Sequence, residues 1–193
     1  LKGLDNMAYI QKQGINGPIF ALISLDSHNY PASGDVTREK LVRTILDAAL
    51  ENGGWTLSGT DADVDMTAMA IQALAPYYST NEAVKTAVDN ALDVLSSMQL
   101  PTGGFGSWGN ENSESCAQVI VALTALGIDP ASDSRFVKDG LTVLDALASY
   151  FVDGGGFRHV SSGDRDGMAT EQAYYALTAY ARFVSNFTRL YDM

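Results

Sequence analysis

The stretch NGGWTLSGTDADVDMTAMAIQAL, residues 52–74, combines a Gly-Gly-aromatic turn with a segment that is apolar on almost every side. Glycine accepts the positive φ angles with which many helices end. A helix that is apolar all round is one surrounded by protein. The stretch therefore predicts a sharp corner followed by a buried helix that begins near residue 64.

The same kind of corner occurs three times along the chain. Gly-Gly pairs begin at residues 53, 103 and 155, so their spacings are 50 and 52 residues, and an aromatic residue follows each pair. Further apolar segments, at 14–30, 114–127 and 171–183, have the character of the segment at 65–78. Self-similarity at a fixed period of this size is typical of repeat architectures.

One-sided helices are predicted before the corners. Residues 82–98 carry apolar residues on one helical stripe and polar residues on the other side, as an amphipathic helix does. Ser79, followed three residues later by Glu82, predicts a capping box at the start of this helix. Residues 38–50 and 136–151 have the pattern of two more one-sided helices.

An outer one-sided helix, a Gly-Gly-aromatic turn and an inner buried helix thus form the repeating unit. Such units stack into an all-α fold, an α/α toroid or an open arc of about four outer/inner helical hairpins, with about eight helices. We expect a single domain over 1–193, with hairpins at about 1–30, 36–78, 79–127 and 133–187. Four hairpins leave apolar ends, so we expect either that a longer parent chain supplies further hairpins or domains, or that another subunit covers those ends.

Composition excludes several classes of function. The 193 residues have a formal charge of −11 and no basic stripe, so we expect no nucleic-acid partner. No apolar run reaches the ~20 residues of a membrane helix, so we expect no membrane insertion. The single cysteine, Cys116, permits neither an intrachain disulfide nor a Cys-rich zinc site.

Two motifs carry a family resemblance. QLPTGGF, Gln99 to Phe105, resembles the Q-x3-G-x-W repeat of squalene-type cyclases, and DVDMTA, Asp63 to Ala68, is similar to the D-x-D-D-T-A stretch of class II cyclases. The chain thus resembles the terpenoid cyclase and protein prenyltransferase superfamily of α/α toroids. Its overall pattern of glycine corners and apolar segments most resembles the prenyltransferase-repeat modules of Gram-positive surface proteins and, more distantly, the helical domain of cobalamin carriers.

The resemblance implies chemistry that this sequence matches only in part. In the cyclase motif Asp65 stands at the proton-donor position, but its neighbour is Met66 where the family has a second aspartate. In prenyltransferases an Asp-x-Cys and a later histidine hold zinc. Here Glu114 and Cys116 form an incomplete set, and Gln172 falls about where the histidine belongs. We therefore expect no cofactor and no metal.

The aspartates at 61, 63 and 65 also match the first positions of a calcium-binding EF-hand loop. Met66 stands where that loop needs glycine and Gln72 where it needs glutamate, which excludes an EF-hand. The simplest interpretation is that Asp63 or Asp65 caps the buried helix, because acidic residues stabilise helix N-termini.

A carbohydrate-active enzyme is an alternative. Asp65, Glu114 and Glu171 occupy equivalent places in three repeats by sequence, and Asp63 lies beside the first of them. Two such carboxyl groups can form the acid and base of a hydrolase or lyase. Equal placement in every repeat instead favours a structural role, because acid–base catalysis needs two different environments.

The sequence thus favours a noncatalytic ligand-binding or adhesion module that uses the concave inner-helix face and an acidic mouth to take up a small molecule or glycan. The resemblance implies a secreted or cell-surface location. An enzyme on the same scaffold, either a degenerate cyclase or prenyltransferase or a carbohydrate-active one, and a structural spacer remain the alternatives. The candidate ligand-binding residues are Trp55, Asp61, Asp63, Asp65, Phe105, Trp108, Glu111, Glu114, Phe157 and Glu171.

Overall fold

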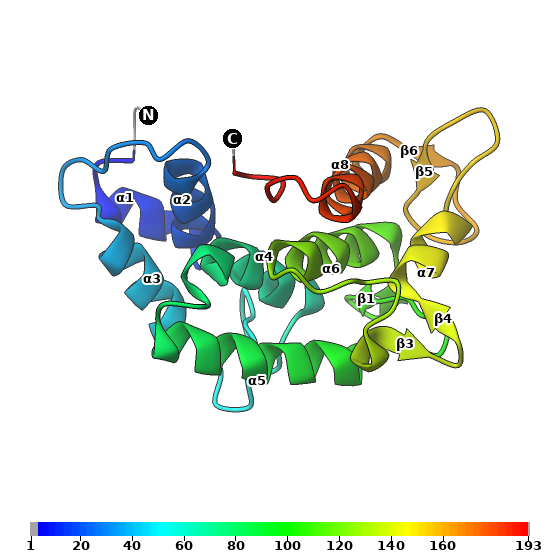
Figure 1. The fold of residues 1–193 in the computed structure, drawn as a ribbon, viewed down its shortest axis with the longest axis horizontal. Helices are drawn as coiled ribbons and strands as arrows, with labels where there is room; N and C mark the ends of the chain where they lie inside the picture. The colour runs from blue at the N-terminus through cyan, green and yellow to red at the C-terminus, as the bar shows by residue number, and fades with distance from the viewer. Residues whose placement is uncertain (1–3, 193) are drawn as a thin grey trace. The chain divides into compact units, whose positions relative to one another are not determined.

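The computed structural model describes residues 4–192, and over this range the chain is mainly helical (Figure 1). These residues form two compact units. Unit 1 comprises residues 4–94 with 191–192, and unit 2 comprises Leu95–Leu190. The boundary lies inside one long helix. The first three residues of the predicted hairpin 1–30 lie outside the described range.

Unit 1 is built around α2, which packs against α1, α3 and α4. Short 3-10 turns, η1 and η2, follow α1 and α4. Its elements are α1 (Met7–Ile10), η1 (Gln11–Gln13), α2 (Asn16–Asp26), α3 (Arg38–Asp47), α4 (Val64–Leu74), η2 (Ala75–Tyr77) and the first part of α5 (Glu82–Met98).

Unit 2 is built around α6, which packs against α7 and lies side by side with α8 (Figure 1). A two-stranded antiparallel hairpin directly precedes each of these three helices. The elements are β1 (Gly106–Ser107), β2 (Asn110–Glu111), α6 (Ser113–Ala125), η3 (Ser134–Phe136), β3 (Val137–Lys138), β4 (Leu141–Thr142), α7 (Val143–Ser149), β5 (Phe157–Arg158), β6 (Arg165–Asp166) and α8 (Gly167–Val184).

The predicted alternation of one-sided and enclosed helices is confirmed for α5 and α6, but the segment predicted as buried at 171–183 lies in α8, where Tyr174 and Leu177 are exposed. In α5 the apolar stripe that includes Val84, Val88 and Leu92 is buried, whereas Lys85 and Asp93 on other sides are exposed. In α6 every residue from 113 to 124 is buried. The fold is all-α and of the α/α-toroid class.

Side chains cap the helices α4, α6 and α8 in one common way. Asp63, Asn112 and Asp166 each accept a hydrogen bond from the backbone N–H three residues later. This arrangement satisfies one of the free N–H groups at each helix start. Of the two aspartates expected to cap α4, it is therefore Asp63 that does so.

Two local predictions were wrong. Asn81, not Ser79, caps α5, because its carboxamide oxygen accepts from the N–H groups of the second and third helical residues. Residues 136–151 do not form one helix. Asp139 and Gly140 both have positive φ and turn the chain into a β-hairpin, so helix α7 begins only at Val143.

The three Gly-Gly corners share one hydrogen-bond pattern. At the first corner the Leu50 N–H donates to the Gly54 carbonyl, 3.0 Å away, and the Gly53 N–H donates back to the Leu50 carbonyl, 2.9 Å away. The same pair of bonds recurs at residues 100–104 and 152–156. A side chain at Gly53 would come within 3.1 Å of the Asn90 carbonyl on α5, so the corner packs closely on that helix.

Each corner buries its aromatic residue, and at the first and third corners a helix hydroxyl satisfies the backbone there. Thr67 Oγ1 accepts from the Trp55 N–H (2.9 Å) and lies 3.1 Å from the Trp55 carbonyl. Thr170 makes the same two contacts with Phe157. Thr67 and Thr170 both stand four residues after a cap, so the corner and the helix cap form one structural unit.

The hydrogen bonds of Gln99, the first residue of the QLPTGGF motif, explain its role in the fold. Its Nε2 donates to the Gly103 carbonyl and to the Phe136 carbonyl, at 2.8 and 2.9 Å. The buried amide therefore ties the second corner to the segment that leads into β3. The motif thus serves the packing of unit 2.

Replacing Thr67 with valine should destabilise the fold. The Trp55 N–H is buried and would lose its partner, which costs about 1–3 kcal/mol of unfolding free energy. Thr178→Val on the exposed side of α8 is the matched control and should change stability by less than about 0.5 kcal/mol. Urea unfolding measures both, and equal effects of the two substitutions would contradict the role given to Thr67.

Candidate functional site

A buried carboxylate lies at the start of α6. The Glu114 residue is only 7% exposed, and its Oε2 lies 3.0 Å from Ser113 Oγ and 2.8 Å from His159 Nδ1. Its Oε1 is buried and has no hydrogen-bond partner among residues 4–192. A buried carboxylate oxygen in this state is costly, so Glu114 has capacity for one more donor.

His159 links this carboxylate to the surface. The His159 side chain is 53% exposed, and its backbone carbonyl accepts from the Ser113 N–H. The loop between β5 and β6 therefore closes over the first turn of α6. No sequence pattern joins His159 to Glu114, because 45 residues separate them.

A phenol and a second carboxylate lie beside Glu114. Burial raises the pKa of Tyr150, and the charges of Cys116, Glu111 and Glu114 raise it further. Glu111 Oε1 accepts from Thr102 Oγ1 at 2.7 Å. A Cβ on residue 104 would lie 2.0 Å from that Glu111 oxygen, so the second glycine of the corner makes room for this carboxylate.

One turn further along α6, a polar network joins α6 to α8. Gln118 Nε2 donates to Gln172 Oε1 at 3.0 Å and is also hydrogen-bonded to the Tyr175 hydroxyl. The Tyr175 hydroxyl in turn donates to Gln172 at 3.3 Å. Gln172, which falls about where prenyltransferases have a zinc-binding histidine, is thus engaged with amide and phenol groups.

Cys116 has the position that threonine has in the other repeats. It lies four residues after the cap Asn112, as Thr67 lies after Asp63 and Thr170 after Asp166.

Among residues 4–192, no group of three or more His, Cys, Asp or Glu side chains is arranged to hold a metal ion. The same part of the chain contains no helix that is both long and apolar enough to span a membrane.

Trp108 is the most exposed large apolar side chain near the start of α6. It is 85% exposed at the tip of the β1–β2 hairpin, where Ser107 pairs with Asn110. Both turn residues, Trp108 and Gly109, have positive φ (54° and 82°), as a type I′ turn requires. A bulky residue in this conformation is strained, and such strain concentrates at functional sites.

The β3–β4 hairpin shows what this turn ordinarily prefers. It also has a two-residue loop, between the paired residues Lys138 and Leu141. Its turn residues, Asp139 and Gly140, have φ angles of 50° and 82°. Asp-Gly is among the favoured pairs for this turn, whereas Trp-Gly is not. We call the group Trp108, Glu111, Glu114 and His159 the α6 mouth, because Glu114 lies in the first turn of α6, His159 contacts it, and the hairpin with Trp108 and Glu111 directly precedes that helix.

The other candidates fall into two groups. Trp55, Phe105 and Phe157 are buried in the corners. Asp61 is exposed, Asp63 caps α4 and Asp65 is half-buried, all three within unit 1.

The predicted equivalence of Glu171 was wrong. Asp65 and Glu114 lie two residues after their caps, but that position in α8 is Met168. Glu171 lies five residues after its cap and is exposed, because α8 begins at Gly167, earlier than the segment 171–183 predicted from the sequence.

Comparisons with known proteins address the fold. No protein-family model matches the chain. No curated protein matches it. Among solved structures it is similar to Candida albicans protein geranylgeranyltransferase-I complexed with GGPP, with a TM-score of 0.60 and 18% identity. The similarity covers 87% of this chain and 49% of that chain, so the chain spans about half of its length. The chain thus has the fold of the α/α-toroid prenyltransferases.

Cys116→Thr should be tolerated. Two of the three repeats have threonine at this position, so we expect the unfolding free energy to change by less than about 1 kcal/mol. The variant should also bind zinc no differently from the parent protein, as measured by titration with a colorimetric zinc indicator. Zinc uptake that is present in the parent and lost in the variant would contradict the structural role of Cys116.

Trp108→Asn should stabilise the protein. Asparagine tolerates positive φ and favours this turn, so we expect a gain of about 0.5–1 kcal/mol in unfolding free energy. The reciprocal change Asp139→Trp, in the matching turn of β3–β4, should cost a similar amount. Thermal and urea unfolding test both, and a loss of stability in Trp108→Asn would mean that Trp108 supports the fold.

Proposed function

We propose that the chain is a noncatalytic binding module that takes up a glycan or a similarly hydroxyl-rich small molecule at the α6 mouth. The observation that carries the proposal is Trp108, a bulky side chain that is 85% exposed and held in a turn conformation that disfavours it. Strain of this kind persists where it serves a function. Tryptophan is also among the residues enriched at the binding hot spots of protein interfaces.

The chemistry of the α6 mouth supports a hydroxyl-rich ligand. The indole face offers a flat, electron-rich surface on which the C–H face of a sugar ring can stack. The unpartnered Glu114 Oε1 is an acceptor for a ligand hydroxyl, and the half-exposed His159 ring offers a further polar contact. An apolar ring with a few polar groups around it is the usual composition of a ligand site.

The proposal includes the setting of the module. We infer a secreted or cell-surface protein, from the resemblance to prenyltransferase-repeat modules of Gram-positive surface proteins. We also infer further domains in a parent chain, a view supported by the coverage of only 49% of the related solved structure.

An enzyme is the second candidate, and one observation favours it. The buried Glu114 carboxylate lies 2.8 Å from Nδ1 of the half-exposed His159. A carboxylate that orients a histidine in this way is a recurrent part of general-base catalysis. The first candidate is preferred because the strain is at Trp108, an apolar group with no acid–base chemistry.

The test uses tryptophan fluorescence with soluble cellohexaose and chitohexaose as probes. Trp55 is fully buried and Trp108 is exposed, so a change on binding reports mainly on Trp108. We expect at least one of the two sugars to shift the emission to shorter wavelength with saturable dependence on concentration. Trp108→Asn should abolish the response while keeping or raising stability.

The double variant Trp108→Asn with Asp139→Trp is the matched control. It keeps an exposed tryptophan on an equivalent hairpin but moves it away from Glu114 and His159, so binding should not return. Release of new reducing ends from either sugar would establish the enzyme alternative instead. Absence of any response from the parent protein to both sugars would leave the spacer interpretation in place of the glycan-binding one.

A further inference from the structure

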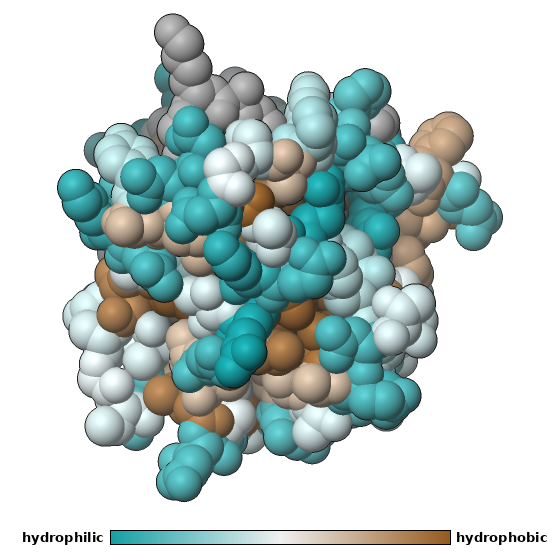
Figure 2. All heavy atoms as spheres, turned by 90° about the vertical axis from the view of Figure 1, so that its left-hand side faces the viewer, coloured by the Kyte–Doolittle hydropathy of each residue, from teal (hydrophilic) through white to brown (hydrophobic). Residues whose placement is uncertain are grey.

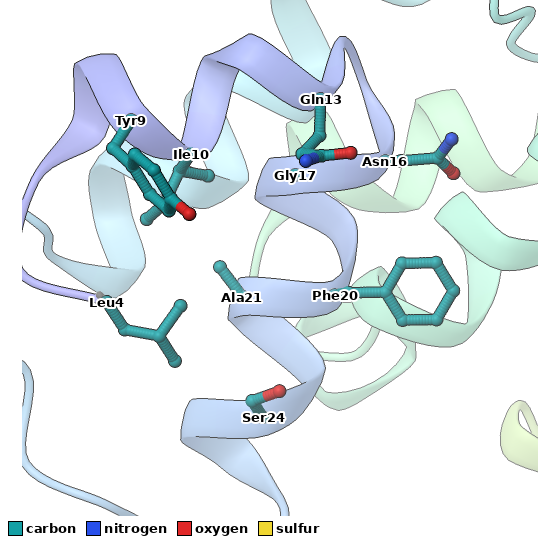
Figure 3. A pocket seen from close by; sticks show the side chains of 9 residues that line it. All are labelled: Leu4, Tyr9, Ile10, Gln13, Asn16, Gly17, Phe20, Ala21 and Ser24. Carbon is teal, nitrogen blue, oxygen red and sulfur yellow. The ribbon is translucent and has the colours of Figure 1, made fainter. Parts of the chain in front are cut away.

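A hollow lies in unit 1, away from the residues used above. It has a volume of about 330 Å³ and lies between α1 with η1 on one side and α2 on the other (Figure 3). Leu4, Tyr9, Ile10 and Ala21 form its apolar part. Ligand pockets generally have volumes of ~300–1,000 Å³, so this one is at the small end of the range.

The wall of this pocket contains no charged side chain among the described residues. That is unusual in a chain of formal charge −11. Lys12 lies 5.8 Å from the centre of the Tyr9 ring but is not part of the wall. Transfer of a charged group into uncharged, apolar surroundings is costly. The wall therefore favours a neutral ligand over an anionic one.

Two aromatic side chains flank the hollow. Tyr9 on α1 is 59% exposed and Phe20 on α2 is 45% exposed, although α2 is otherwise an enclosed apolar helix. Figure 3 shows the Tyr9 ring on the α1 side and the Phe20 ring projecting from α2. Figure 2 shows the face formed by the side of α1 to α3 that is at the left of Figure 1. Hydrophobic residues are visible there in hollows between hydrophilic ones.

Polar groups at the edge of the pocket are few and uncharged. Gln13, Asn16 and Ser24 contribute two carboxamides and a hydroxyl to its lining. A small number of polar groups around an apolar wall fixes the orientation of a bound molecule. These groups suit a ligand that carries one hydroxyl or carbonyl group.

The pocket is built on closely packed backbone. A Cβ on Gly17 would lie 1.9 Å from the Ile10 carbonyl oxygen, so α1 and α2 approach as closely as a glycine permits. The Met7 N–H donates to Asp35 Oδ1 at 3.0 Å, which ties the start of α1 to the segment before α3. A wall that is already ordered loses little entropy on binding a ligand.

We propose that this pocket is a binding site for a small, neutral, largely apolar molecule that contains a ring, of about ten to twenty non-hydrogen atoms. The pocket volume, the uncharged wall and the flanking aromatic rings together define this class of ligand. The site is independent of the α6 mouth, since all of its lining residues belong to unit 1.

The test compares two fluorescent dyes that share a ring system and differ in charge. Phenylnaphthylamine is neutral, and anilinonaphthalene sulfonate carries a negative charge. We expect the neutral dye to bind with one-to-one stoichiometry and at least about tenfold more tightly, because the sulfonate must lose water in an uncharged pocket. Equal or tighter binding of the sulfonate would overturn the proposal.

Two substitutions locate the dye. Ser24→Phe places a ring in the pocket and should weaken binding of the neutral dye by about tenfold or more. Phe20→Ala removes a flanking ring from an exposed position and should weaken it several-fold without unfolding the protein. Ser97→Phe on α5 and Phe187→Ala near the C-terminus are the matched controls, and both should leave the dye affinity unchanged.

Circular dichroism verifies that each variant is folded, and sedimentation measures the oligomeric state. If Ser24→Phe does not fold, the decision rests on Phe20→Ala against Phe187→Ala. Equal dye affinity in those two variants would overturn the proposal. So would a dimer of the parent protein that Phe20→Ala dissociates, because the hollow would then be an interface between two copies.

Discussion

Burial of an aromatic ring at each Gly-Gly corner is the constraint on which the rest of the structure depends. The ring can enter the core only if the N–H and carbonyl of its own residue keep hydrogen-bond partners there. At two corners a threonine hydroxyl from the following helix supplies both contacts, as Thr67 does for Trp55. The corner, the cap and the first turn of the inner helix must therefore form together, which sets where each inner helix begins.

This coupling explains how far the sequence could predict the fold. The corners and the buried helices were predictable because glycine pairs and unbroken apolar segments are local signals. The segment 136–151 was mispredicted because the spacing of its apolar residues suits a helix, while the turn at Asp139 and Gly140 interrupts that helix. The cap of α5 was misplaced by two residues because Ser79 and Asn81 are both good caps, and only the backbone path distinguishes them.

The candidate site was less predictable, for a different physical reason. Glu114 and Trp108 could be proposed from the sequence as candidate ligand-binding residues. The contact between Glu114 and His159 joins residues 45 positions apart, and no periodicity reports such a contact. Glu171 was matched to Glu114 because the apolar segment was taken to begin at residue 171, whereas α8 begins at Gly167 and Glu171 lies in its second turn. The pocket in unit 1 depends on how closely α1 approaches α2. Gly17 permits this approach, but a glycine in the sequence does not predict it.

The two equivalent hairpins of unit 2 distinguish a structural tryptophan from a functional one. If the turn needed a large apolar group, the β3–β4 hairpin would need one too, yet it has Asp139 at the matching position. If Trp108 packed on the fold, its side chain would be covered, yet 85% of it is exposed. Trp108 therefore has a strained backbone conformation, and its side chain does not offset that strain by packing against the rest of the module. Strain without a structural return is the pattern expected where a side chain is kept for what it contacts outside the chain.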